Sequence, residues 1–134
     1  MIMKRDPEFL TLAEVIGIHA NQIELYGGQH GIRDLGLLQS ALAQPQASFA
    51  GEWLHTGIFH MAAAYAFHIC SNHPFLDGNK RAALAAALVF LVMNGQDIKD
   101  PKQRLLDAML DMAKGKLNKE KFAQILRELA GTNL

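Results

Sequence analysis

Several features that would point to secretion or to a membrane are scarce or missing in this sequence. Its 134 residues include a single cysteine, Cys70, so an internal disulfide is excluded and a reducing compartment suits the chain. The longest stretch without a polar residue, 82–93, is too short to span a bilayer. Residues 1–6 contain no apolar segment of the kind found in secretory signals. We therefore expect a cytoplasmic protein that does not bind a membrane.

A net charge is absent as well. The 13 basic residues equal the 13 acidic ones, so the formal charge at pH 7 is zero with histidine neutral. A chain without net charge has no long-range attraction for nucleic acid, and direct binding to nucleic acid is not expected. Because 50% of the residues are apolar and the length fits one domain, we expect residues 1–134 to form a single domain with a hydrophobic core.

Alternating apolar and polar residues, the pattern of exposed strands, are also missing, whereas helix signals recur along the whole chain. Thr11 and Glu14 form a capping box at the start of one helix, and Asp34 can cap another. Asp100 as N-cap with Pro101 as the first helical residue, and Asn118 as N-cap, mark the starts of the last two helices, and Gly131 marks the end of the final one. Residues 46–55 are expected to be a connector that Phe49 and Trp53 anchor in the core. Caps, glycines and apolar periodicity predict helices at about 11–26, 34–43, 57–71, 79–94, 100–114 and 118–130.

The third and fourth of these helices are expected to form the centre of the domain. The third is apolar around most of its circumference, which indicates a buried helix. Alanine is abundant in both, and its short side chain allows two helix backbones to approach closely. The sequence thus predicts an all-α fold, a compact bundle of about six helices with a central helical hairpin.

The polar segment between these two helices carries most of the reactive groups. It reads His-Pro-Phe-Leu-Asp-Gly-Asn-Lys-Arg and spans residues 73–81. His73 suits a general base at neutral pH, because the unperturbed pKa of imidazole is about 6.5. Asp77 offers the oxygen ligands that Mg²⁺ prefers when it bridges phosphate oxygens.

A phosphate site is predicted where the fourth helix begins. Gly78 allows a sharp turn and a close approach of a ligand to the backbone. The N–H groups of the first turn, starting at Asn79, and the cations of Lys80 and Arg81 would attract phosphate. A base, a metal-binding carboxylate and a phosphate site are the groups needed to transfer part of a nucleotide to a hydroxyl.

A structural interpretation of the same residues stays open at this point. His73 and Asp77 could pin a loop between two helices, and Lys80 and Arg81 could form a solvated helix start. The apolar helical surroundings of Cys70 favour a buried neutral thiol over a nucleophile. The other histidines form no pattern that predicts a zinc site.

The nine residues 73–81 resemble the signature of the Fic/Doc superfamily, His-x-Phe-x-[Asp/Glu]-Gly-Asn-[Gly/Lys]-Arg. The N-terminal half is similar to the shorter, death-on-curing (Doc) branch. This similarity is carried by His19, Tyr26-Gly27-Gly28, Gly31-Ile32-Arg33-Asp34 and the segment 38–45. Together the two resemblances cover about residues 10–129.

The resemblance implies an all-α fold with the signature segment between two central helices. It implies that His73 deprotonates a hydroxyl of a target protein and that Asp77 holds Mg²⁺. The phosphates of ATP would be bound by the residues that open the fourth helix, namely Gly78, Asn79, Lys80 and Arg81. A flap would dock the backbone of the target by strand addition, and its candidate residues are Gly28, Ile32, Arg33 and Asp34.

Two departures from the adenylylating Fic pattern imply a different reaction. Lys80 stands where that pattern has glycine, and Leu84 stands where it has a second arginine. Both features match the Doc branch, whose members are toxins of toxin–antitoxin pairs and transfer the γ-phosphoryl group of ATP to a translation elongation factor. The implied partners are therefore such a target and a small antitoxin. Ala85 is a departure from the phage-type member, which carries a polar residue there.

Two other functions are compatible with this sequence. A Fic-type enzyme would transfer AMP, instead of phosphate, to a protein hydroxyl. A non-catalytic module would use the fold to bind a nucleotide or a partner protein. The presence of the base, the carboxylate and the phosphate-binding cations together argues against a module that has lost its activity.

Overall fold

The computed structural model describes residues 6–100 and 102–130, which form six helices and one small two-stranded hairpin. In chain order the elements are α1 (Leu12–Tyr26), α2 (Leu35–Ala43), β1 (Ser48–Phe49), β2 (Glu52–Trp53), α3 (Ile58–Asn72), α4 (Asn79–Met93), α5 (Arg104–Ala113) and α6 (Lys119–Ala130). The prediction of a helical bundle is confirmed. Among these residues, no helix is long and apolar enough to cross a bilayer.

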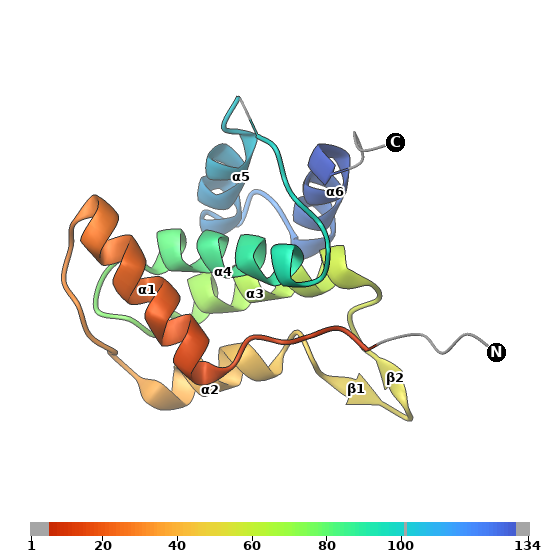
Figure 1. Cartoon of the computed structure of the whole chain (residues 1–134), viewed down its shortest axis with the longest axis horizontal. Helices are drawn as coiled ribbons and strands as arrows, with labels where there is room; N and C mark the ends of the chain where they lie inside the picture. Colours follow the sequence, from red (N-terminus) through yellow and green to blue (C-terminus); the bar gives the residue numbers. More distant parts are fainter. Residues whose placement is uncertain (1–5, 101, 131–134) are drawn as a thin grey trace.

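α3 and α4 lie side by side at the centre of the molecule, as their alanine content predicts (Figure 1). α1 packs against α4 and α2 against α3, while α5 and α6 cover the other side of the pair. The alanines of the two central helices that have no exposed surface are Ala62, Ala63, Ala64, Ala66, Ala82, Ala83, Ala86 and Ala87. Close packing of these short side chains holds the loop between α3 and α4 at two rigid ends.

Large aromatic side chains complete the core around this pair. Tyr65, Phe90 and Phe122 are fully buried. The hydroxyl oxygen of Tyr65 accepts a hydrogen bond from the backbone N–H of Leu10 at 2.9 Å, so its polar end is satisfied inside the core. Burial raises the pKa of Tyr65 to about 12. This bond fixes the segment that leads into α1.

The predicted helix caps are confirmed at α1, α2 and α6. Thr11 and Glu14 form both bonds of the capping box, at 3.1 and 2.8 Å. The side chain of Asp34 accepts a hydrogen bond from the N–H of Leu37 at 2.9 Å. Local sequence signals therefore decide where these helices begin.

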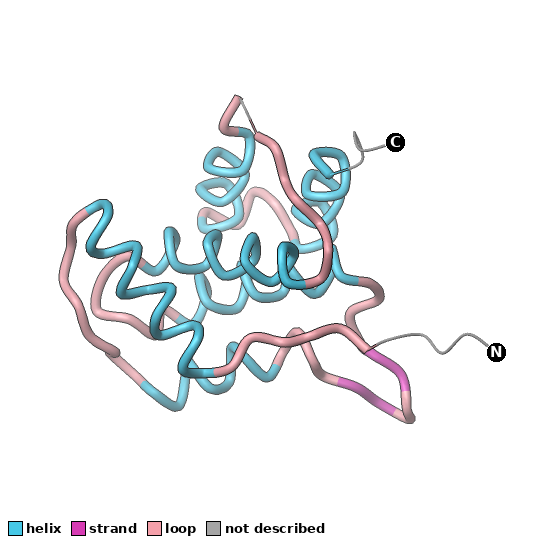
Figure 2. Tube along the Cα trace, viewed as in Figure 1, coloured by secondary structure: helices cyan, strands magenta, loops and turns pink. Residues whose placement is uncertain are grey.

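Residues 46–55 differ from the prediction, because β1 and β2 pair there as an antiparallel hairpin (Figure 2). The turn consists of Ala50 and Gly51, both with positive φ, of 53° and 82°, which suits a two-residue hairpin turn. Phe49 is 76% exposed, so the prediction that it anchors this segment in the core is wrong. Trp53 is partly exposed and its ring lies 5.4 Å from that of Phe9.

α5 begins at Arg104, later than the predicted start at about residue 100. Gln103, in the left-handed conformation with φ of 56°, precedes it. Asp100 still caps the helix, because its two carboxylate oxygens accept the N–H groups of Arg104 and Leu105, each at 2.8 Å. The predicted roles of Pro101, as the first helical residue, and of Gly131, as the end of the last helix, lie outside the described residues.

Candidate functional site

The signature loop (residues 73–78) joins α3 to α4 through two residues in the left-handed conformation. His73 is the C-cap of α3 with φ of 52°, and Gly78 is the N-cap of α4 with φ of 72°. A Cβ on Gly78 would lie 2.9 Å from the terminal methyl group of Ile23, so both the conformation and the packing there favour glycine. The loop therefore presents both His73 and Asp77 at the same end of the molecule.

Phe75 and Asn79 anchor the signature loop in the core. Phe75 is fully buried and Asn79 is 4% exposed. The Asn79 side chain accepts a hydrogen bond from the N–H of Phe75 at 2.9 Å and donates one to its carbonyl oxygen at 3.0 Å. The side-chain amide of Asn79 thus holds the loop. The group of Asn79 that could bind phosphate is its backbone N–H, which lies in the first turn of α4.

His19 of α1 packs against the signature loop and hydrogen-bonds to it, a role that the sequence analysis missed. Its ring stacks on Phe75 with the centroids 3.8 Å apart and the planes 3° apart. Its Nε2 lies 2.7 Å from the carbonyl oxygen of Asp77, which can only accept, so Nε2 carries the proton. Burial, as the largest cause, lowers the pKa of His19. The sequence signal was a histidine in register with Val15 and Ile23 on the buried face of α1, where a polar ring must find a partner.

Asp77 has its carboxylate held by two backbone N–H groups. Oδ1 accepts from Gly78 at 2.8 Å and Oδ2 accepts from Gln29 at 3.1 Å. These bonds, first that of Gln29 and then that of Gly78, lower the pKa of Asp77, and Arg81 adds to the effect. The carboxylate is therefore ionised at neutral pH, exposed and fixed in direction.

The flap (residues 27–34) runs alongside the signature loop and is bonded to it. Ile32 forms an isolated antiparallel bridge with Phe75, and the N–H of Leu76 donates to the carbonyl of Gly31 at 3.0 Å. A Cβ on Gly28, whose φ is 118°, would lie 2.8 Å from Oδ2 of Asp77. Glycine is therefore required where the flap passes the carboxylate.

The four predicted flap residues have different surroundings. Gly28 passes Asp77, while Ile32 is 37% exposed. Asp34 caps α2. The guanidinium of Arg33 donates to the backbone carbonyls at the end of α3, with Nε 2.6 Å from the oxygen of His73.

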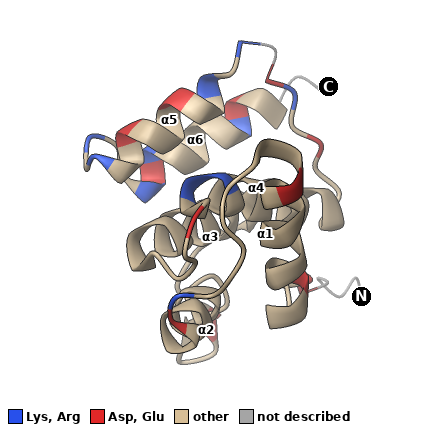
Figure 3. Cartoon of the chain, turned by 90° about the vertical axis from the view of Figure 1, so that its left-hand side faces the viewer, with Lys and Arg blue, Asp and Glu red and all other residues tan. Residues whose placement is uncertain are grey.

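α4 begins with two cations, Lys80 and Arg81, and Figure 3 shows this basic part of the helix in blue. The Nη2 of Arg81 donates to the carbonyl of Gly27 at 3.0 Å, and its guanidinium lies 5.8 Å from the ring centre of Tyr26. Gly78 provides no side-chain cap, so α4 presents the N–H groups of its first turn and the positive end of its dipole. This end of α4 suits phosphate.

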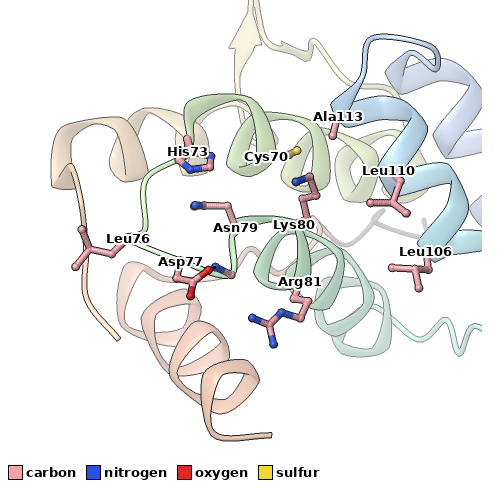
Figure 4. Close-up of a pocket in the computed structure, with 11 residues that line it drawn as sticks. Cys70, His73, Leu76, Asp77, Asn79, Lys80, Arg81, Leu106, Leu110 and Ala113 are labelled. Carbon is pink, nitrogen blue, oxygen red and sulfur yellow. Dashed lines mark hydrogen bonds between the residues drawn. The ribbon is translucent and has the colours of Figure 1, made fainter. Parts of the chain in front are cut away.

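A cleft of about 510 Å³ brings these groups together. Figure 4 shows that its wall comes from three parts of the chain, the end of α3 with the signature loop, the start of α4, and α5. The side chains that line it include His73, Asp77, Lys80, Arg81, Leu106 and Leu110. The contribution of α5 was not predicted, although Leu106 and Leu110 are 46% and 38% exposed and lie one turn apart on the helix.

A thiol and a second cleft lie next to these reactive groups. Cys70 lines the first cleft and is half-buried, whereas a buried thiol was predicted; burial raises the pKa of this thiol, so it is neutral, as predicted. A second cleft of about 510 Å³ shares Lys80 and Arg81 with the first, and its lining includes Tyr26 and Leu84. A base, an ionised carboxylate and an anion site with an apolar wall fit the transfer of a phosphorus group from a nucleotide.

Comparison with known proteins agrees with this geometry. The model of the Fic/DOC family matches residues 9–91. "Protein kinase doc" of Escherichia phage P1 is 35% identical over 119 residues, which cover 89% of this chain and 93% of that protein. "Toxin Doc" of Mycolicibacterium smegmatis is 44% identical over 70 residues, which cover 52% of this chain and 54% of that protein.

Proposed function

Because this chain belongs to the Fic/DOC family, we propose that it is a Doc-type protein kinase and the toxin of a toxin–antitoxin pair. Its reaction would transfer the γ-phosphoryl group of ATP to a serine or threonine hydroxyl of a protein. The observation that carries the proposal is the convergence of His73, Asp77, Lys80 and Arg81 on one cleft. The similarity to a protein kinase over 89% of the chain supports it.

In the proposed reaction, a ring nitrogen of His73 takes the proton of the target hydroxyl while the hydroxyl oxygen attacks the γ-phosphorus. The bond from the γ-phosphorus to the oxygen that bridges it to the β-phosphorus breaks, and ADP leaves with that electron pair. Lys80, Arg81 and the first-turn N–H groups of α4 bind the phosphate oxygens and stabilise the charge of the transition state.

The residues present fit a bound Mg²⁺. Asp77 is ionised and exposed, and each carboxylate oxygen that accepts one N–H bond keeps a second lone pair. Among the described residues there is no group of three or more side chains that could hold a metal. Mg²⁺ needs no such group, because it is commonly bound by one carboxylate together with substrate phosphates, whose charge it neutralises.

Lys80 and Leu84 favour phosphoryl over adenylyl transfer. Lys80 adds a cation and fills space that a glycine would leave to the pyrophosphate. Leu84 lines the second cleft beside Tyr26 and Leu88, so an apolar side chain stands where the AMP-transferring pattern has an arginine. The proposed partners are a protein target, of the translation elongation factor class implied by the resemblance, and a small antitoxin. We place this reaction in the cytoplasm, where ATP and such a target occur.

Labelled ATP distinguishes the candidate reactions. The purified protein is incubated with a bacterial lysate, Mg²⁺ and ATP labelled at either the γ or the α position. We expect protein-bound label from γ-labelled ATP alone. Label retained only from α-labelled ATP would establish AMP transfer instead, and label from neither would leave a binding module.

His73→Ala should lower the rate of label transfer by about 10²–10⁴-fold, the usual effect of a general base. ATP binding, measured by calorimetry, should persist, because the phosphates contact α4 and not His73. His60→Ala, a histidine in the first turn of α3 and outside the cleft, is the matched control. If ATP binding and transfer fell together, His73 would have a structural role.

A further inference from the structure

Three consecutive carbonyl groups at the end of α3 receive hydrogen bonds from the flap. The Arg33 side chain donates from Nε to the oxygen of His73 at 2.6 Å and from Nη2 to the oxygen of Asn72 at 3.0 Å. The backbone N–H groups of Arg33 and Asp34 donate to the oxygen of Pro74 at 2.7 and 3.0 Å. Arg33 therefore contacts the backbone of His73 and of both its neighbours.

The backbone of His73 has a conformation that depends on such contacts. Its φ and ψ are both 52°, a left-handed conformation that residues other than glycine rarely adopt. The last carbonyls of a helix have no partner within the helix, and a glycine commonly follows them. Here the planar fork of a guanidinium satisfies two of these carbonyls at once, and its charge complements the negative end of the α3 dipole.

We propose that Arg33 is a positioning residue for the general base His73, an inference that rests on the proposed kinase function. The direction of the imidazole follows from the backbone angles of His73, because these angles set the direction of the Cα–Cβ bond. A base must lie within hydrogen-bond reach of the proton that it takes. Arg33 stabilises those angles. Its side chain hydrogen-bonds to backbone carbonyls at the end of α3 and does not line the cleft. The other residues of the flap would then dock the target protein.

The first test compares Arg33→Gln and Arg33→Lys with the wild type, with label transfer from γ-labelled ATP to lysate protein as the readout. Arg33→Gln should lower the rate at saturating ATP by about 10- to 100-fold, the range expected for a misplaced catalytic group. The dissociation constant for ATP should change less than about twofold, because Arg33 is not part of the phosphate site. Arg33→Lys should recover part of the rate, since an ammonium can reach one of the two carbonyls.

The decisive measurement is made in the His73→Ala background. A residue that acts through His73 has nothing left to position there, so adding Arg33→Gln should leave the residual rate unchanged. A further loss by the same factor as in the wild type would overturn the proposal, because Arg33 would then contact the substrate or hold the whole fold.

Arg104→Gln controls for the loss of an arginine elsewhere. It removes an exposed ion pair with Glu128, whose Nη2 to Oε1 distance is 3.0 Å, and should leave the transfer rate unchanged. An Arg33→Gln variant as active as the wild type would overturn this inference alone. A wild type that transfers no label would overturn the kinase function and this inference together, so the two failures are distinguishable.

Discussion

At the scale of single residues, Asp77 has a defined partner for each of its three oxygen atoms. Its carboxylate oxygens accept from Gly78 and Gln29, and its carbonyl oxygen accepts from His19. These partners come from α1, the flap and the N-cap of α4, so the carboxylate is held by two bonds and the backbone of Asp77 by a third before any ligand binds. Such preorganisation lowers the cost of binding a cation beside the phosphates.

Asp77→Asn tests the proposed role of this carboxylate in binding Mg²⁺. The change removes the negative charge and turns one acceptor oxygen into an NH₂ group that faces an N–H group. The Mg²⁺ concentration needed for half-maximal label transfer should therefore rise severalfold. An unchanged Mg²⁺ dependence with a lower rate would show that Asp77 acts only by holding the flap.

Gly28→Ala should disturb the same carboxylate from the other side. The φ of Gly28 is 118°, and the added Cβ would lie 2.8 Å from Oδ2 of Asp77. Gly27→Ala is the matched control, because its φ of 84° imposes similar strain while nothing lies within 4 Å of the added Cβ. Both variants should lose about 1–3 kcal/mol of unfolding free energy. We expect label transfer to fall strongly in Gly28→Ala alone, and equal loss in both would contradict the argument.

At the scale of the elements, the central pair α3 and α4 determines how accurately the cleft is built. The signature loop has only six residues, so any shift of one helix against the other moves His73 relative to Lys80. The fully buried alanines between these helices and their neighbours leave no room for such a shift. Packing of the core and geometry of the site are therefore coupled through α4.

Ala86→Leu tests this coupling. Ala86 has no exposed surface, and a larger side chain there would force the helices apart. Overpacking of this kind costs about 1–3 kcal/mol of unfolding free energy, measurable by urea denaturation.

Gly17→Ala, in the middle of α1, should raise the unfolding free energy instead, because nothing lies within 4 Å of the added Cβ. It should stabilise the protein by about 0.5–1 kcal/mol.

At the scale of the whole molecule, a cluster of two histidines and a lysine joins the start of α6 to α3 and to the segment before α3. The Nζ of Lys119 lies 3.2 Å from Nε2 of both His55 and His68. An ammonium can donate to both rings only while they are neutral. Burial, followed by Lys119, lowers the pKa of His55, and the same causes lower that of His68 to about 4.

This cluster should make the fold sensitive to mild acid. His68 has a pKa near 4 in the folded protein and about 6.5 in the unfolded chain. As the pH falls, the unfolded chain therefore takes up this proton at a higher pH than the folded protein does. The contribution of His68 to the unfolding free energy should thus be fully present above about pH 6.5 and should be lost as the pH falls toward 4. Urea denaturation at pH 7.5 and 5.0 measures the loss, which should shrink in His68→Gln and persist in His60→Gln. An equal loss in both variants would rule out the cluster as its source.

The helices, the caps of α1, α2 and α6, and the position of the signature loop between α3 and α4 could be predicted because their signals are local. Thr11, Asp34 and Asn118 cap the helices that follow them within three residues. The register of His19 on α1 indicates a buried ring, but the partners of His19 and Arg33 could not be predicted, since they lie 58 and 40 positions away and a single sequence carries no signal of such pairing. β1 and β2, with two residues each, are too short to show alternation.

The same long-range bonds set the order in which the site can form during synthesis. His19, Gln29 and Arg33 bond to residues 58, 48 and 40 positions later in the chain. At a translation rate of about 5–20 residues per second, the flap leaves the ribosome roughly 2–10 s before the loop that it supports. A nascent chain interrupted before Arg81 would therefore be inert. For a protein proposed to be a toxin, this delay gives an antitoxin made nearby time to meet the chain before it can react.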